Sequence, residues 1–523
     1  MKARRLRRLP FAALLLAAAT ALSAAAQPSR PHKARPGPLS ATINAIVSEP
    51  AVARAHWGIS VVSSEGAPVY ALSDNQLFEP ASNAKLLTTA AALALFPPHV
   101  TYTTIAATQG ELDSNGRLHG NVVLLGAGDP TLSGRTYPYA EKTERPNPPL
   151  AALQTIADQI AASGVRSIDG DIIGDDSWFP FERYGSGWAW DDLAWSYGAP
   201  VSALTINDNV VYLNLPPNGQ QPSPWNPDTP YYTLENSLTV LPGTQPANPG
   251  IDRQPGSKTV RVFGTTNQNG LHVALAIEDP AEYAAIALRQ MLLGHGIEIT
   301  GSPRALHRLP ADTQDFRAEV DQPLVLHPLT LSTIQPPANG LRVLASHVSP
   351  PFEQDIVVTN KVSQNLHTEL FLRTLGRLVG GDGSIAQGAR VVRQFLINAG
   401  VDPSDFIFYD GSGLSPQDLI TPRAITHLLT YASRQSWGET YRASLPIGGV
   451  DGSLAGRFSD HALKGKVLAK TGTLGEVSAL SGYLTAASGR TIVFSILCNN
   501  HAPTGDAARV AIDRIVAAIA AAN

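Results

Sequence analysis

The chain of 523 residues contains a single cysteine, Cys498, and this scarcity removes several kinds of site. One thiol cannot form an intramolecular disulfide, and it excludes metal sites built from several cysteines. No His-Glu-x-x-His pattern occurs among the 13 histidines, so the usual signature of a zinc peptidase is also missing. The sequence therefore predicts neither a metal nor another cofactor, and we expect Cys498 to be a small buried hydrophobe.

Excess positive charge and long apolar runs are absent as well. Lys and Arg number 39 against 43 Asp and Glu, which gives a formal net charge of −4. An acidic body gives no support for a nucleic-acid partner. With 43% hydrophobic and 16% charged residues, the composition is that of a globular protein rather than a disordered chain or a coiled coil. Beyond the leader, no uncharged apolar run reaches the length of a membrane-spanning helix, so we expect no transmembrane segment in the mature chain.

The leader itself has the three parts of a secretory signal. A basic stretch, 1–8, precedes an Ala-rich apolar stretch, 9–22, and small residues precede Gln27. We therefore expect a cleavable signal peptide at 1–26 and an exported protein, placed in the periplasm either free or peripheral to the membrane or cell wall. Four prolines in 27–40 predict an extended lead-in.

The order of the predicted elements indicates an interrupted domain. Helices and antiparallel strands alternate in 41–100 and again in 334–523, whereas 101–333 contains mostly short strands separated by Pro, Gly and Asn turns. A helix is expected from Ser82 to Phe96, and a long helical segment from Phe352 to Leu378. The fold class predicted is α+β, with the two outer pieces forming one domain and 101–333 forming an insertion of one or two nested domains.

Three short motifs that could carry chemistry follow one another along the chain. Each is weak alone, because its residues could equally be a helix cap, a solvated polar side chain and an exposed strand end. Their order, and the element on which each falls, favour a common site. The motifs are Ser82-Asn83-Ala84-Lys85, Ser363-Gln364-Asn365 and Lys470-Thr471-Gly472-Thr473.

These residue types suit acyl transfer to a serine hydroxyl. A hydroxyl needs an adjacent base, and positions i and i+3 share a helix face, so Lys85 can take the proton of Ser82. Lys85 would be neutral if it is buried or if a second cation such as Lys470 lies nearby. Ser363 would relay the proton to the leaving amine, and Asn365 would hold Lys85 and the substrate amide. The backbone N–H groups of Ser82 and Thr473 would stabilise the oxyanion.

The motifs and their flanking sequences resemble the D-alanyl-D-alanine carboxypeptidase/endopeptidase family, the class C low-mass penicillin-binding proteins. The resemblance covers nearly all of the mature chain. It implies a transpeptidase-like domain, peptidoglycan stem peptides and cross-links as substrates, and acylation by β-lactams. It also implies that Thr471, Gly472 and Thr473 bind the substrate. The flanking sequences are 79–86, 126–132, 169–176, 203–209, 410–414 and 445–454.

Gln364 and Asp192 need separate interpretation, because one differs from the usual second motif and the other lies outside the three motifs. Gln364 occupies a position where Asp is commoner, and we expect this change to matter little. Asp192, beside Trp188 and Trp190, could bind the free amino group of diaminopimelate, a role that an inserted-domain Asp has in the family; a solvated loop carboxylate is the simpler interpretation. A β-lactamase or esterase on the same fold, and a cell-wall binding scaffold with an inactive site, remain alternatives.

Overall fold

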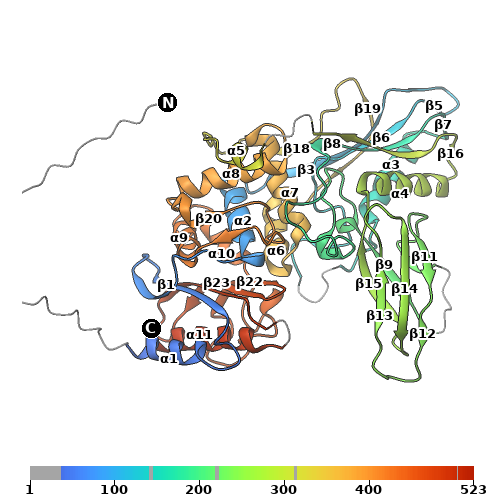
Figure 1. Cartoon of the computed structure of the whole chain (residues 1–523). Helices are drawn as coiled ribbons and strands as arrows, with labels where there is room; N and C mark the ends of the chain where they lie inside the picture. Colours follow the sequence, from blue (N-terminus) through green and yellow to red (C-terminus); the bar gives the residue numbers. More distant parts are fainter. Residues whose placement is uncertain (1–36, 141–144, 218–222, 311–314, 503–504) are drawn as a thin grey trace, which may run out of the picture. The chain divides into compact units, whose positions relative to one another are not determined.

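The computed structural model describes residues 37–140, 145–217, 223–310, 315–502 and 505–523 (Figure 1). The predicted signal peptide and most of the predicted lead-in lie outside these residues. Where the description begins, the prediction is wrong for three residues: helix α1 (Pro38–Val47) starts at Pro38. Proline fits the first turn of a helix, because the N–H that it lacks would have no partner there.

A five-stranded antiparallel sheet brings the two ends of the chain together. The strand order is β2-β1-β24-β23-β22, so the N-terminal hairpin pairs with the last strand. Strand β22, which carries Lys470, forms one edge of the sheet. The bounds of these strands are His56–Ser63 (β1), Pro68–Leu72 (β2), Val467–Leu474 (β22), Val477–Thr485 (β23) and Thr491–Asn499 (β24).

Each face of this sheet is covered by helices (Figure 1). Side chains alternate along a strand, and in β24 Phe494 and Ile496 pack with α1 and α11 (Ala507–Ala522), whereas Val493 and Leu497 pack with the other helices. Cys498 is fully buried on the α11 side, as predicted. The helices of the second face are α2 (Lys85–Leu95), α6 (Phe352–Val362), α7 (Asn365–Leu375), α8 (Ile385–Asn398), α9 (Pro422–Ala432) and α10 (Gly438–Ser444).

The segment predicted as one helix from Phe352 to Leu378 is two helices with a break at Ser363. Ser363 has φ 62° and ψ 44°, the left-handed conformation, which ends α6. The side chain of Gln364 then accepts a hydrogen bond from the Leu366 N–H and caps α7. No glycine or proline marks this break, so helical periodicity alone did not reveal it.

The residues between β3 (Thr101–Thr108) and β19 (Arg342–Val348) form several small sheets with their own core. The largest has the order β17-β8-β6-β3-β18, and β19 also pairs with β3. Helices α3 (Ala151–Ala162) and α4 (Pro280–Gly294) pack against it. Its other strands are β6 (Val122–Leu125), β8 (Ile172–Pro180), β17 (Pro303–Arg308) and β18 (Thr333–Ile334).

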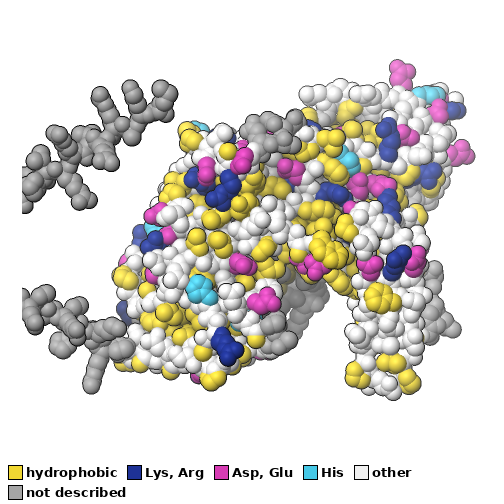
Figure 2. Space-filling model, in the orientation of Figure 1, with side chains coloured by type: hydrophobic (Ala, Val, Ile, Leu, Met, Phe, Trp, Pro, Cys, Tyr) yellow, Lys and Arg dark blue, Asp and Glu magenta, His cyan; other side chains and the backbone are white. Residues whose placement is uncertain are grey.

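Three smaller sheets complete this region, which we call the inserted region. On the face shown in Figure 2, acidic and basic side chains are interspersed, and neither sign of charge forms a continuous patch. The three sheets are β10-β9-β15 (Trp225–Asn226, Val210–Leu215, Leu271–Ala276), β16-β7-β5-β4 (Glu298–Ile299, Ser167–Ile168, Arg117–His119, Glu111–Leu112), and β11, β12 and β13 around β14 (Thr233–Asn236, Thr239–Val240, Pro249–Asp252, Thr259–Thr266).

Candidate active site

The first motif lies on a strained turn that leads into α2. Residues Ala81–Ala84 form a 3-10 turn (η1), and Ala81 before the serine has φ 46°, a conformation that costs about 1 kcal/mol or more for a residue with a side chain. The turn places Ser82 and Lys85 on one face. The Nζ of Lys85 donates to the Oγ of Ser82 at 2.9 Å. The predicted contact between nucleophile and base is therefore present.

Lys85 is completely buried and has three hydrogen-bond acceptors. Besides Ser82, its Nζ donates to Oδ1 of Asn365 at 2.5 Å and to the backbone oxygen of Ser412 at 2.7 Å. Burial lowers the pKa of Lys85 to about 7, against the opposing attraction of Asp410, Glu369 and Asp418. An amine with a pKa in this range can accept a proton at neutral pH.

The second and third motifs meet at the hydroxyl of Ser363. The Nζ of Lys470 donates to Oγ of Ser363 at 2.8 Å and to the backbone oxygen of Thr471 at 2.9 Å. Lys470 is also completely buried, and burial together with the charge of Lys85 lowers its pKa well below the usual value. The structure thus brings the five predicted side chains together as two neighbouring hydrogen-bonded groups, Ser82, Lys85 and Asn365 in one and Ser363 and Lys470 in the other, and the charge of Lys85 acts on Lys470.

Next to these groups, the outer edge of β22 is open, because no strand of the described residues pairs with it there. Residues Pro446 and Gly448 occupy the first part of the edge, through hydrogen bonds to the Ala469 N–H and the Val467 oxygen. Backbone groups alternate in direction along a strand, so Thr471 and Thr473 present their N–H and C=O groups to the same edge. The hydroxyl of Thr471 is 2.7 Å from Oγ of Ser453. Gly472 brings the strand close to the nucleophile turn, because a Cβ there would lie 2.7 Å from the Pro80 oxygen.

The loop 410–415 contributes a group that sequence reasoning missed. Asp410 is buried, and its carboxylate accepts hydrogen bonds from the N–H groups of Ser412, Gly413 and Ser415. Folded in this way, the loop aims the Ser412 oxygen at Lys85. In the sequence, 410–414 is one of the flanking segments that carry the resemblance, and its glycines and Asp410 are the signal of a tight turn.

The inserted region reaches this cluster through a loop that contains Trp188 and Asp192. The indole N–H of Trp188 donates to Oδ2 of Asp410 at 2.7 Å, and the Nδ2 of Asn365 donates to the Tyr197 oxygen at 2.8 Å. The hydroxyl of Tyr197 in turn donates to Oδ1 of Asp192 at 2.9 Å. Asp192 does not touch the other predicted residues, but Tyr197 connects it to Asn365.

A cavity of about 580 Å³ lies elsewhere, between the β1–β2 hairpin and α9. It is lined by residues such as Tyr70, Arg423 and His427, and by none of the predicted site residues. The cluster of five side chains, rather than this cavity, is the place where the predicted nucleophile, the predicted base and the edge of β22 occur together.

Comparisons with known proteins point to one family. A family model described as the D-Ala-D-Ala carboxypeptidase 3 (S13) family matches residues 39–325 and 313–520. The chain is 31% identical over 477 residues to the D-alanyl-D-alanine carboxypeptidase of Actinomadura sp. (strain R39), which covers 88% of this chain and 80% of the relative. It is 26% identical over 454 residues to the D-alanyl-D-alanine carboxypeptidase DacB of Haemophilus influenzae, which covers 82% and 81%.

The same fold occurs in a solved structure. The crystal structure of penicillin binding protein 4 (dacB) from Haemophilus influenzae superposes with a TM-score of 0.71 and 22% identity, and covers 91% of this chain and 97% of that one. The predicted α+β fold with a large, β-rich extra region is confirmed.

Proposed function

The chain belongs to the D-Ala-D-Ala carboxypeptidase 3 (S13) family of serine peptidases, and on that premise we propose that Ser82 is the nucleophile of a D-Ala-D-Ala carboxypeptidase. The observation that carries the assignment is the contact of the Ser82 hydroxyl with a buried lysine amine, whose other acceptors are Asn365 and Ser412. Lys85 takes the proton of Ser82 as its oxygen attacks the carbonyl carbon of the D-Ala-D-Ala amide.

The tetrahedral intermediate then collapses to an acyl-enzyme. Its oxyanion accepts hydrogen bonds from the N–H groups of Ser82 and of Thr473 at the open edge of β22. The C–N bond breaks as the leaving amine of the terminal D-Ala receives a proton through Ser363, whose hydroxyl is bonded to Lys470. Lys85 then deprotonates a water molecule that attacks the acyl carbonyl, and it returns the proton to Oγ of Ser82 as the ester C–O bond breaks, which releases the shortened peptide and regenerates Ser82.

Substrate recognition is assigned to β22 and to Asp192. A peptide that lies along the open edge of β22 adds a strand to the sheet, and Thr471 and Thr473 bind its terminal carboxylate. Asp192 is half-buried beside aromatic residues, which suits the ammonium group of a diaminopimelate side chain. With such a site for the second peptide chain, the enzyme would also cleave D-Ala-to-diaminopimelate cross-links as an endopeptidase.

Because β19 pairs with β3, we place the end of the inserted region near residue 348 rather than at 333. We further propose that residues 1–26 are removed on export to the periplasm, which N-terminal sequencing of the secreted protein would test. Within the residues that the structure describes, no helix has the length and apolar content that a bilayer span requires.

The test is the intact mass of the protein after exposure to benzylpenicillin. A β-lactam has an amide that Ser82 can attack, and its expelled amine stays tethered to the acyl group, so we expect a stable adduct on wild-type protein and none on Ser82→Ala. An adduct that persists on Ser82→Ala would show that the nucleophile is misassigned. Steady hydrolysis of the penicillin by wild-type protein would instead favour a β-lactamase.

The role of Asp192 needs a separate measurement. Asp192→Asn keeps the size of the side chain and removes its charge. We expect a higher KM for peptides with a free side-chain ammonium and an unchanged rate of penicillin acylation. Equal effects on peptides with and without that ammonium would contradict the assignment.

A further inference from the structure

The turn that carries Ser363 and Asn365 is held in place by the inserted region. Asn365 donates to the Tyr197 oxygen, and two of its neighbours contact a single carboxylate, that of Asp208. The Nε2 of Gln364 lies 3.2 Å from Oδ2 of Asp208, and Nε2 of His367 lies 3.2 Å from its Oδ1. All three contacts cross from the inserted region to the start of α7.

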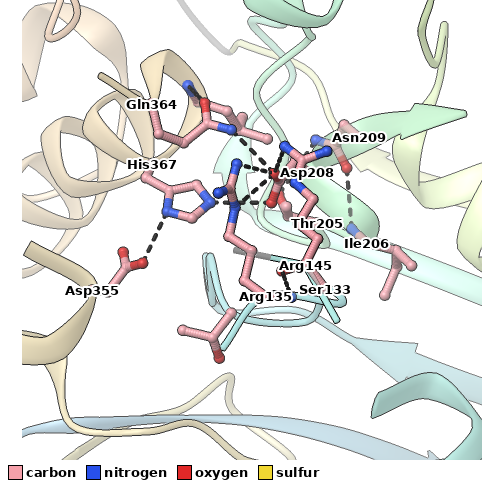
Figure 3. Close-up of polar contacts among 12 residues, drawn as sticks. Ser133, Arg135, Arg145, Thr205, Ile206, Asp208, Asn209, Asp355, Gln364 and His367 are labelled. Carbon is pink, nitrogen blue, oxygen red and sulfur yellow. Dashed lines mark hydrogen bonds and ion pairs between the residues drawn. The ribbon is translucent and has the colours of Figure 1, made fainter. Parts of the chain in front are cut away.

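Asp208 is buried on a strained turn, and its carboxylate contacts the side chains of Gln364, His367, Arg135 and Arg145 (Figure 3). Three successive residues, Asn207, Asp208 and Asn209, have φ of 52°, 53° and 52°. Single residues rarely adopt this conformation unless the surrounding structure over-determines it, and here side-chain amides do so. Nδ2 of Asn209 donates to the Pro200 oxygen, and Nδ2 of Asn207 to the Val210 oxygen. The turn therefore presents the Asp208 carboxylate in a fixed direction.

The charges around Asp208 keep it ionised. Burial by itself would raise the pKa of Asp208, but Arg135, His367 and Arg145 hold it well below its usual value. Nη2 of Arg135 and Nη2 of Arg145 each lie 2.7 Å from Oδ2. His367 is also bonded to Asp355, at 2.9 Å, and the two carboxylates outweigh the effect of burial and raise the pKa of His367 to about 9. At neutral pH both His367 nitrogens therefore donate.

We propose that Asp208 is a positioning residue for the reaction, which acts through Gln364 and His367 to hold the Ser363-Gln364-Asn365 turn against Lys85 and Lys470. This proposal rests on the proposed function of that turn. It leads to the opposite expectation from the one drawn from the sequence, that Gln364 matters, because the amide of Gln364 can donate to Asp208 and an ionised carboxylate at that position cannot. The inserted region is then part of the catalytic geometry, in addition to any part in substrate binding.

If the contacts of Gln364 only stabilised the fold, replacing it would affect stability rather than acylation specifically. Gln159 provides the comparison that separates the two cases. Gln159 lies in α3 and holds the edge of β19, where Nε2 donates to the Ser346 oxygen at 2.9 Å and Oε1 accepts from the Ser346 N–H at 3.0 Å. Gln159 is the same residue type as Gln364 but lies within the inserted region, and the amide oxygen of each side chain accepts from a backbone N–H. Gln159 does not touch the turn, so it separates loss of stability from loss of position.

The experiment compares Gln364→Glu with Gln159→Glu. Gln364→Glu keeps the acceptor that caps α7, but it replaces the donor to Asp208 by a second negative oxygen at about the same distance. We expect the second-order constant for acylation by a fluorescent penicillin to fall about tenfold or more, with a melting temperature close to that of wild type. We expect Gln159→Glu to lower the melting temperature at least as much and to leave acylation within about twofold of wild type.

The double variant with Asp208→Asn tests the pair directly. Without the charge on Asp208 the new carboxylate has less to repel it, so the loss in Asp208→Asn/Gln364→Glu should be smaller than the product of the two single losses. Independent effects of the two changes, or wild-type acylation by Gln364→Glu, overturn the inference alone. Equal losses of acylation in Gln364→Glu and Gln159→Glu also overturn it. A wild-type protein that retains no penicillin overturns the proposed function and this inference with it.

Discussion

Lys85 and Lys470 are two buried amines that serve different hydroxyls, Ser82 and Ser363. Each loses hydration on burial, and Lys470 also experiences the charge of Lys85. Two ammonium ions in one dry cluster repel each other strongly, so at least one is neutral near pH 7. The carboxylates of Asp410 and Glu369 favour the charged form of Lys85 and oppose the effect of burial, which leaves the pKa of Lys85 at about 7. Lys85 is thus suited to exchange a proton during each cycle.

The pH dependence of acylation follows from this value. Only neutral Lys85 can accept the Ser82 proton, so the acylation constant should fall about tenfold per pH unit below pH 7 and level off above it. Stopped-flow measurement with a fluorescent penicillin between pH 5 and 9 would give the midpoint. Glu369 needs a control, since burial and Asp410 raise its pKa to about 7 as well. Because the charge of Glu369 raises the pKa of Lys85, Glu369→Gln should keep the tenfold slope and move the midpoint to lower pH, and a constant wild-type rate from pH 5 to 9 would contradict the role of Lys85.

At the scale of elements, local signals predicted the first helix well and the second only in part. The helix expected from Ser82 to Phe96 is the turn η1 followed by α2, and it ends within one residue of the prediction, before Pro97. The break at Ser363 was missed because its left-handed residue is a serine and its cap is a glutamine, both ordinary in helices. What stabilises that break is contact with Asp208, about 155 residues away, which no local pattern contains.

The turn that presents Ser82 packs against the loop 410–415, and Gly413 makes that contact possible. Gly413 has φ +75°, and a Cβ there would lie 1.9 Å from the Ala81 oxygen. Gly413→Ala should therefore lower stability by about 2 kcal/mol or more and displace the nucleophile turn, with a large loss of acylation. Gly489 is the matched control, because it has φ +84° but open space around its Cβ.

Comparison of the two glycine variants separates backbone strain at the substituted residue from displacement of the turn that carries Ser82. Gly489→Ala should cost only the backbone term, about 1 kcal/mol, and leave acylation unchanged. Thermal unfolding and penicillin acylation of both variants provide the check. If Gly413→Ala acylates as fast as Gly489→Ala, the contact with Ala81 does not position the nucleophile.

At the scale of the whole molecule, the site draws on segments from both outer pieces and from the inserted region. The three motifs are far apart in the sequence. It could still be predicted that they meet, because all three belong to one family resemblance. The contacts from Trp188, Tyr197 and Asp208 could not, because long-range side-chain hydrogen bonds leave no periodicity in the sequence. Their effect is to tie the insertion to the catalytic cluster at three points.

The indole of Trp188 provides the most direct test of this coupling. Its N–H donates to Asp410, and Asp410 folds the loop whose Ser412 oxygen contacts Lys85. Trp188→Phe keeps an aromatic ring against the neighbouring core but removes a hydrogen bond to a charged group, so acylation should fall about five- to tenfold with little change in melting temperature.

The control for that variant is Trp225→Phe, because Trp225 is a buried tryptophan of the inserted region that packs near Tyr232, in a different core. It should lose stability through poorer packing and keep the wild-type acylation constant. Both variants replace an indole by a phenyl ring. A difference between their acylation constants is therefore attributed to the lost hydrogen bond with Asp410. If Trp188→Phe loses stability and keeps the wild-type acylation rate, the loop that contains Trp188 stabilises the fold without setting the position of Lys85.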